Sequence, residues 1–234
     1  VLETDLTLET EMRFFLTEPE VREPLTLLHT RIPCDDQVTT ENLKMMESCF
    51  AESLSLFPKN YAFDVVGYGC TSASLIIGDK KIEEIVKKNV TTKNVTTPLI
   101  AVKRGLKALK VKTIGYLAPY VSEISEAMCR NLQAAGWTVG TAATFSENRD
   151  SIVGNISPNS ILDTLRTMKS HNGTLEAIFI SCTSLKCARI IQLAEDELGI
   201  PIISSNAAIA WDMARLSGSQ IKTENKGVLF QKLN

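Results

Sequence analysis

The chain has 234 residues, 44% of them hydrophobic, which is enough for one large domain or two small domains with buried cores. Lys and Arg number 25 against 27 Asp and Glu, so the formal net charge of -2 does not favour nucleic acid or an anionic membrane as a partner. No apolar stretch approaches the roughly 18 residues of a membrane-spanning helix, and the first residues do not resemble a signal peptide. We therefore expect a globular, cytoplasmic protein.

Short β-rich runs alternate with helical patterns along the chain. Val1 and Leu2 are typical of the end of a strand, so we expect natural residues before Val1. Strands are then predicted at residues 25–33, 63–69, 94–97, 113–119, 138–145, 177–181 and 200–205, and helices at 41–56, 98–110, 122–135, 158–170, 184–198 and 207–217. Apolar strands that alternate with helices indicate a parallel sheet covered on both faces, so the predicted fold class is α/β.

Two segments of the chain repeat the same order of features. Residues 63–85 and 175–198 each contain an acidic residue, an apolar strand, the triplet Cys-Thr-Ser and an amphipathic helix, and their cysteines lie 112 positions apart. This duplication predicts two similar parallel-sheet α/β halves related by a pseudo-twofold axis, with the active site in the cleft between them. We expect residues 1–105 to form the first half, with residues 206–234 packing back on it, and residues 106–205 to form the second half.

The cysteines and histidines show no pattern of a disulfide framework or a zinc site, because no Cys-x-x-Cys pair occurs. The Gly-x-Gly pair at 67–69 lacks the third glycine of a dinucleotide fingerprint, and the lysine of a P-loop is absent. We therefore expect neither a metal nor an organic cofactor. Four of the six cysteines are interpreted as small buried hydrophobic residues: Cys34, Cys49, Cys129 and Cys187.

The remaining cysteines, Cys70 and Cys182, each follow a predicted strand and precede Thr-Ser. Ligands of open parallel sheets bind at the carboxyl ends of the strands, where helix N-termini favour anions and thiolates. A lone cysteine after an apolar strand is more often a buried hydrophobic residue, but the duplicated context favours function. Two facing halves would place the thiols on opposite sides of a small acid. Donors for its carboxylate would come from Thr71, Ser72, Thr183 and Ser184.

A series of motifs extends over nearly the whole chain: TDLTLETE (4–11), LLHTRIP (27–33), GYGCTSAS (67–74), VTTP (95–98), IGYLAPYVSEI (114–124), FSENRDSIVGNISPNSI (145–161), FISCTSL (179–185) and PIISSNAAIAW (201–211). Together they resemble the aspartate/glutamate racemase superfamily, and most of all its maleate cis-trans isomerase branch with the related ectoine-utilisation proteins. The resemblance implies that Cys70 and Cys182 carry the chemistry. It also implies that Tyr120 helps to bind the substrate carboxylate and that Asn148 belongs to a substrate-binding loop.

Departures from these family patterns are informative. The isomerases have an asparagine near the N-terminus where this chain has Asp5, a pattern closer to the ectoine-utilisation relatives. A carboxylate at this substrate-binding position repels a dicarboxylate, which favours a substrate that bears an amine. Arylmalonate decarboxylases keep only the second cysteine, so Cys70 argues against decarboxylation. Glutamate racemases have a histidine after the second cysteine, where this chain has Thr183.

The predicted function is a cofactor-independent isomerase of a small carboxylate or amino acid. In the maleate-type mechanism the Cys70 thiolate adds to the double bond, the new single bond rotates, and elimination gives the trans product while Cys182 supplies or accepts the proton. Because an unperturbed thiol has a pKa of about 8.5, we expect the helix dipole and the donors to lower the pKa of one thiol.

Two alternatives remain open: a racemase or epimerase in which the thiols act on opposite faces, and a non-catalytic small-molecule binding protein. The sequence also leaves open whether the chains form a homo-oligomer.

Overall fold

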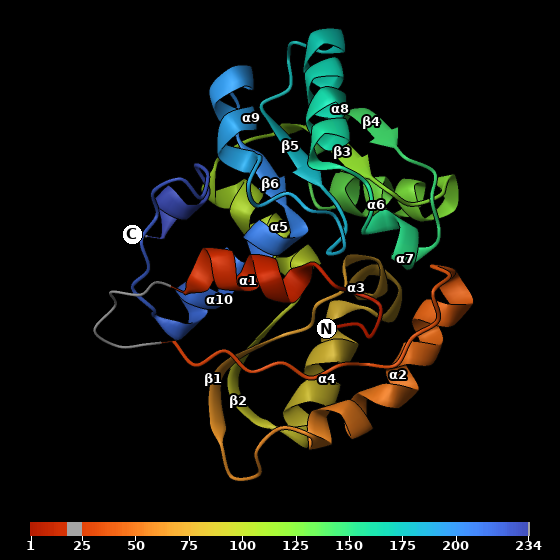
Figure 1. The fold of residues 1–234 in the computed structure, drawn as a ribbon, viewed down its shortest axis with the longest axis vertical. Helices are drawn as coiled ribbons and strands as arrows, with labels where there is room; N and C mark the ends of the chain where they lie inside the picture. Colours follow the sequence, from red (N-terminus) through yellow and green to blue (C-terminus); the bar gives the residue numbers. More distant parts are fainter. Residues whose placement is uncertain (18–24, 234) are drawn as a thin grey trace.

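The computed structural model describes residues 1–17 and 25–233. Its elements, drawn in Figure 1, are α1 (Leu8–Leu16), α2 (Thr40–Ser55), β1 (Ala62–Gly67), α3 (Thr71–Ile77), α4 (Asp79–Asn89), β2 (Thr91–Thr96), α5 (Pro98–Ala108), β3 (Thr113–Ala118), α6 (Ser122–Ala134), β4 (Thr138–Thr144), α7 (Asp150–Val153), α8 (Pro158–His171), β5 (Ala177–Ile180), α9 (Ile191–Leu198), β6 (Ile202–Ser204), α10 (Ser205–Ser217) and a 3-10 helix (Phe230–Lys232).

The strands form two parallel sheets. β1 pairs with β2, and a four-stranded sheet has the order β4-β3-β5-β6. Parallel neighbours need a crossover connection, which the intervening helices provide. The central strand β5 is buried at all four of its positions, whereas the edge strand β4 alternates between exposed and half-buried residues. The prediction of an α/β fold with parallel sheets is confirmed.

Helix α10 crosses from one sheet to the other. It follows directly on β6, yet it packs against β1, β2, α5 and α1, and in Figure 1 it lies with α1 between the upper and the lower sheet. Its fully buried Asp212 accepts hydrogen bonds from Thr96, the last residue of β2, and from Arg104 on α5, each at 2.6 Å. These contacts tie α10 to the two-stranded sheet. The division of the chain at residue 105 stays a prediction.

Two of the predicted elements are wrong. Residues 25–31 form no strand, because the only ladder contact of this segment is the isolated bridge between Leu2 and Ile32. The helix expected at 184–198 begins only at Ile191. The preceding residues form a loop because the backbone N–H groups of Cys187 and Ala188 donate to the side chain of Glu11 and not to a carbonyl of a preceding turn.

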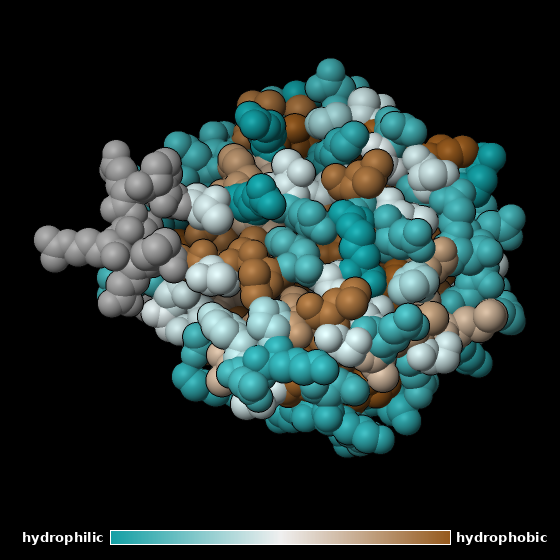
Figure 2. All heavy atoms as spheres, turned by 60° about the horizontal axis from the view of Figure 1, so that its bottom comes forward, coloured by the Kyte–Doolittle hydropathy of each residue, from teal (hydrophilic) through white to brown (hydrophobic). Residues whose placement is uncertain are grey.

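The surface is mainly polar on the face shown in Figure 2, where apolar residues form small groups among hydrophilic ones. Exposed large apolar residues include Leu6 and Leu56, and single exposures of this kind are ordinary for globular proteins. Within the described ranges, no helix combines the length and the apolar character needed to cross a bilayer.

Candidate active site

Cys70 lies where the chain turns from β1 into α3. It is the N-cap residue of the helix, and its Sγ accepts a hydrogen bond from the N–H of Ala73 at 3.4 Å and lies 3.5 Å from the hydroxyl of Ser72. Gly69 before it contacts Leu8 of α1, and a Cβ at this position would overlap the Leu8 side chain. The glycine therefore lets the N-terminal helix pack directly against the turn that carries the thiol.

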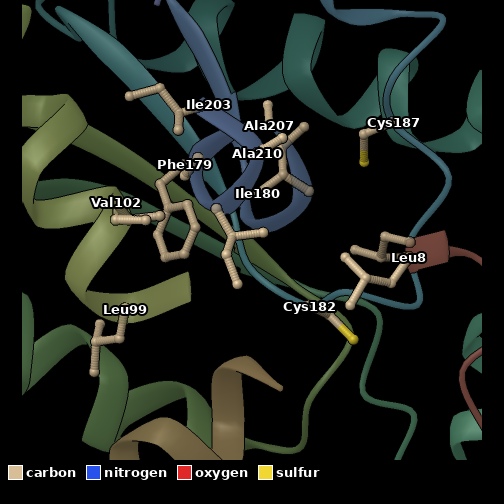
Figure 3. Packing of buried hydrophobic residues seen from close by; sticks show 14 of the residues in the cluster. Leu8, Leu99, Val102, Phe179, Ile180, Cys182, Cys187, Ile203, Ala207 and Ala210 are labelled. Carbon is tan, nitrogen blue, oxygen red and sulfur yellow. The ribbon is translucent and has the colours of Figure 1, made fainter. Parts of the chain in front are cut away.

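Cys182 reaches the same region from β5 but in a different local structure. Its φ of 136° lies in a range that residues other than glycine rarely adopt, and no helix starts behind it. In Figure 3 its side chain lies next to Leu8, beyond the apolar cluster that contains Phe179 and Ile180. The two cysteines thus share their position after a strand, while only Cys70 begins a helix.

A single serine connects the two cysteine segments. The hydroxyl of Ser205, the first residue of α10, accepts hydrogen bonds from the backbone N–H of Cys182 at 3.1 Å and from the hydroxyl of Thr71 at 2.8 Å. Ser205 is fully buried, so both bonds are shielded from water. Ser205 was not predicted as a site residue, although its position directly after β6 is one at which parallel sheets place ligand-binding groups.

Both thiols line one small cavity of about 20 Å³, roughly the space of one water molecule. Of the other predicted residues, Thr71, Ser72, Tyr120 and Thr183 also line it. A larger cavity of about 910 Å³ between β1 and residues 25–29 contains neither thiol. We assign the candidate active site to the small cavity because both reactive side chains line it.

The remaining predicted residues lie around this cavity. Ser184 is buried, and its hydroxyl donates to Asp150 at 2.7 Å. Asp5 is fully buried and accepts hydrogen bonds from the N–H groups of Thr7 and Leu8. Asn148 does not line the cavity; Asp150, two residues further along the same loop, takes that place. The backbone carbonyl of Asn148 instead accepts the N–H of Val38.

Residues 36–38, which precede α2, are bonded to the 147–151 loop beside the cavity. The Asp36 carboxylate accepts the N–H and the hydroxyl of Ser151 at 2.7 and 2.8 Å, and its carbonyl accepts the N–H of Asp150 at 2.9 Å. Gln37 and Arg149 form an isolated antiparallel bridge beside these bonds. This set of contacts, which we call the clasp, joins segments more than a hundred residues apart in the sequence.

Glu11 fixes the loop that follows Cys182. Its Oε1 accepts the N–H groups of Cys187 and Ala188 at 2.6 and 2.8 Å, and its Oε2 accepts the Asn206 amide at 2.9 Å. Only 6% of the Glu11 residue is exposed, and burial is the main reason that its pKa rises from 4.5 to about 7, although these hydrogen bonds oppose the rise. A buried carboxyl group from the first turns of the chain therefore shapes the second cysteine segment.

Burial also raises the pKa of the two thiols. It raises the pKa of Cys70 to about 12, and it raises the pKa of Cys182 well above its ordinary value, with Asp150 and Asp5 adding to both increases. A hydrogen bond with Tyr120 acts in the opposite direction on the pKa of Cys182. The expectation that the surroundings lower one thiol pKa is wrong for this closed cavity, because desolvation outweighs the few donors.

Comparison with known proteins shows which family the chain belongs to. Residues 53–230 match the family described as arylmalonate decarboxylase. The chain belongs to this family. Family members share the α/β architecture of the aspartate/glutamate racemase superfamily, so the superfamily recognised from the motifs is confirmed.

Several maleate isomerases are among the relatives and the solved structures to which this chain is similar. The enzyme of Nocardia farcinica is 24% identical over an alignment of 241 positions, and the alignment covers 98% of this chain and 92% of the relative. A maleate isomerase variant from Pseudomonas putida S16 with maleate has a TM-score of 0.87 at 21% identity, covering 99% of this chain and 95% of the other. A variant of the Nocardia farcinica enzyme with a covalently bound succinylcysteine intermediate has a TM-score of 0.85 at 22% identity, covering 99% and 97%. The fold is therefore that of the maleate isomerases, and the relatives support the predicted class, a cysteine-based isomerase.

Proposed function

We propose that the protein is a cofactor-independent isomerase of a small carboxylate, with Cys70 and Cys182 as its catalytic residues. The observation that carries the proposal is the meeting of these two thiols, from separate strands, in one cavity with Tyr120. The succinylcysteine intermediate in the similar Nocardia farcinica enzyme supports covalent chemistry at a cysteine. The Asp5 pattern supports a relation to ectoine-utilisation proteins.

The proposed reaction begins with addition of the Cys70 sulfur to one carbon of a conjugated double bond. The electron pair of the double bond moves toward the carboxylate, where hydroxyl and backbone donors stabilise the developing charge, and Cys182 protonates the second carbon. Rotation about the new single bond, return of that proton to Cys182 and loss of the Cys70 sulfur regenerate the alkene in its trans form. Because burial raises the pKa of both thiols, the Cys70 proton has to leave to solvent as the substrate binds, before the sulfur can add to the double bond.

A racemase or epimerase is the second candidate. The same two thiols would then remove and replace a proton at a saturated carbon from opposite faces, without a covalent adduct. The observation that favours it is that Cys70 and Cys182 line the same cavity, as proton removal and delivery by two thiols require. The two mechanisms differ in their substrates, because addition needs an alkene and two-base transfer exchanges a hydrogen of a saturated compound with solvent.

The test is proton NMR in deuterated buffer with maleate, aspartate, glutamate and ectoine-pathway intermediates. We expect conversion of an alkene by the parent protein, its loss in Cys70→Ser and in Cys182→Ser, and its retention in Cys129→Ser, whose thiol is half-buried on α6. Mass spectrometry of Cys182→Ser with substrate should detect an adduct on the peptide that contains Cys70. Deuterium at the α-carbon of an amino acid, with no alkene conversion, would favour the racemase. Unchanged ligand binding without any conversion would favour the binding protein.

A further inference from the structure

The backbone of Cys182 lies in a conformation that most residues avoid. Its φ of 136° is rare for residues other than glycine, and a residue keeps such a conformation only where surrounding contacts hold it. The next helix, α9, begins only at Ile191, so a helix does not pair the N–H and carbonyl groups of the residues that follow Cys182. Because buried backbone groups need partners, the contacts that hold this segment come from other parts of the chain.

Side chains from distant elements supply these contacts. The carbonyl of Thr183 accepts the side-chain amide of Asn206 at 2.8 Å, and the carbonyl of Ser184 accepts the hydroxyl of Thr7 at 2.9 Å. The same amide nitrogen of Asn206 donates to Oε2 of Glu11 at 2.9 Å. Asn206 therefore links the residue after Cys182 to the carboxylate that holds the end of the loop.

The surroundings of Asn206 indicate more than a packing role. The residue is fully buried, and its amide nitrogen donates to two oxygens, while its own carbonyl oxygen Oδ1 has no hydrogen-bond partner. The opposite orientation of the amide would place Oδ1 against the oxygens of Glu11 and Thr183. An unpaired buried oxygen is unfavourable, and an apolar side chain would avoid it, so packing alone does not explain an asparagine here.

The first half of the chain has no such residue at the matching position. Asn206 is the second residue of α10, after the N-cap Ser204, and the second residue of α5, after the N-cap Thr97, is Leu99. Leu99 is buried among apolar residues. In that half Cys70 begins α3, and the helix itself pairs the backbone groups behind the thiol. The asparagine thus stands in the half whose cysteine lacks a following helix.

We propose that Asn206 is a positioning residue for Cys182, with Glu11 as its anchor. The inference rests on the proposed function, which it deepens by naming the residue that holds the second thiol in place. Asn206 does not line the two-thiol cavity, so it acts through the main chain at Thr183. Its loss should therefore impair the proton transfers at Cys182 and leave substrate binding and the addition of the Cys70 sulfur largely intact.

The experiment separates the two hydrogen bonds of Asn206. Asn206→Ala removes both, and Asn206→Asp keeps the shape but replaces the donor with an oxygen. The double variant Glu11→Gln/Asn206→Asp exchanges donor and acceptor between the two positions. It restores the bond between them but leaves the Thr183 carbonyl without its donor. The control Ser157→Ala removes an N-cap hydrogen bond at the start of α8.

Three quantities are measured for each protein at pH 8. They are kcat and KM with maleate as the probe, the ratio of iodoacetamide labelling of Cys182 to that of Cys70 by peptide mass spectrometry, and the urea midpoint of unfolding. The same mass spectra report the fraction of protein that carries a maleate adduct on the Cys70 peptide. The urea midpoint shows a structural role, whereas the labelling ratio and the split between kcat and KM show positioning of the thiol.

We expect Asn206→Ala to lower kcat at least about tenfold with KM within about twofold, because misplaced catalytic groups slow the reaction steps they carry out. The adduct on Cys70 should accumulate, since its release needs return of the proton to Cys182, and the labelling ratio should rise severalfold. The double variant should recover at least about half of the urea midpoint lost in Asn206→Asp, yet keep the low kcat and the high ratio. Ser157→Ala should lower the midpoint and keep the kcat and the ratio of the parent protein.

Recovery of kcat and of the labelling ratio together with the midpoint in the double variant would overturn the inference, because Asn206 would then be structural only. Values like those of the parent protein in Asn206→Ala would overturn it as well. If Asn206→Ala does not fold, the double variant carries the test. Absence of any conversion by the parent protein would contradict the proposed isomerase instead, and the labelling ratio would still decide whether Asn206 positions Cys182.

Discussion

Replacement of Glu11 by Gln tests how a buried carboxyl group shapes the cysteine loop. In the folded protein the pKa of Glu11 lies at about 7 against an ordinary value of 4.5, mainly because of burial. A carboxyl group whose pKa is raised on folding binds its proton more tightly in the folded state. Its contribution to stability is therefore fully present below pH 4.5 and is lost as the pH rises toward 7. From 4.5 to about 7, at about 1.4 kcal/mol for each pH unit, the loss amounts to about 3 kcal/mol.

The assay is urea unfolding of the parent protein and of Glu11→Gln between pH 5 and pH 8. Gln keeps an oxygen for the N–H groups of Cys187 and Ala188 but has no proton to lose. The free energy of unfolding of the parent protein, taken relative to the variant, should fall by about 2 to 3 kcal/mol over this range. Other buried carboxyl groups titrate in both proteins and cancel in the difference. Glu84→Gln, an exposed site on α4, is the control and should follow the parent protein.

Parallel curves for the parent protein and Glu11→Gln would refute the reasoning. They would mean that the three hydrogen bonds to the carboxylate compensate its burial fully and that the charge has no net cost in the folded state. A difference that rises with pH would show that the folded protein stabilises the ionised carboxylate, which is opposite to the direction argued here.

Three further predictions concern the thiols and the segments that hold them. Alkylation of Cys70 by iodoacetamide, followed by peptide mass spectrometry, should accelerate about tenfold for each pH unit between 7 and 9, because a pKa of about 12 leaves the thiol protonated over that range. Asp36→Ala removes the carboxylate that accepts two hydrogen bonds from Ser151 in the clasp. Because this loosens the clasp beside the cavity, the alkylation rate of Cys70 should increase severalfold at fixed pH. Ser205→Ala removes the hydroxyl shared by the two cysteine segments; we expect about 1–2 kcal/mol lower stability in urea unfolding and a lower kcat with little change in KM.

Each of these predictions has an outcome that contradicts it. An alkylation rate that levels off near neutral pH would mean an ionised thiol at rest. An unchanged rate in Asp36→Ala would show that the clasp does not limit access to the cavity. An unchanged kcat in Ser205→Ala, with folding intact, would separate the hydroxyl bridge from the alignment of the thiols.

The fold class and the two cysteines could be predicted because they depend on local pattern. Apolar runs such as residues 177–181 predict buried strands. The Cys-Thr-Ser triplets that follow two such runs indicated the edge of the sheet at which the candidate site lies. Tyr120 followed from the resemblance and lines the cavity, although its role in binding the substrate carboxylate stays a proposal.

Other parts of the site depend on distant contacts that no local pattern contains. The loop after Cys182 is held by Glu11, far away in the sequence, so periodicity alone favoured a helix there. Asp150 replaces Asn148 at the cavity because the clasp sets how the 147–151 loop lies. The raised pKa values of the two thiols are caused mainly by burial. The sequence suggests only the helix dipole and nearby donors, which favour a lower pKa, because burial depends on residues from distant parts of the chain.

The path of α10 has a consequence for how the protein is made. On the ribosome, β1, β2 and α5 emerge well before residues 205–217, which cover them in the finished protein. Until that helix has left the exit tunnel, the apolar surface beneath it is open to other chains, a condition that promotes aggregation of partly folded proteins. The segment that contains β1, β2 and α5 therefore stays partly uncovered until α10 has been made. Slow translation of the last third of the chain would lengthen the time for which this segment needs a chaperone.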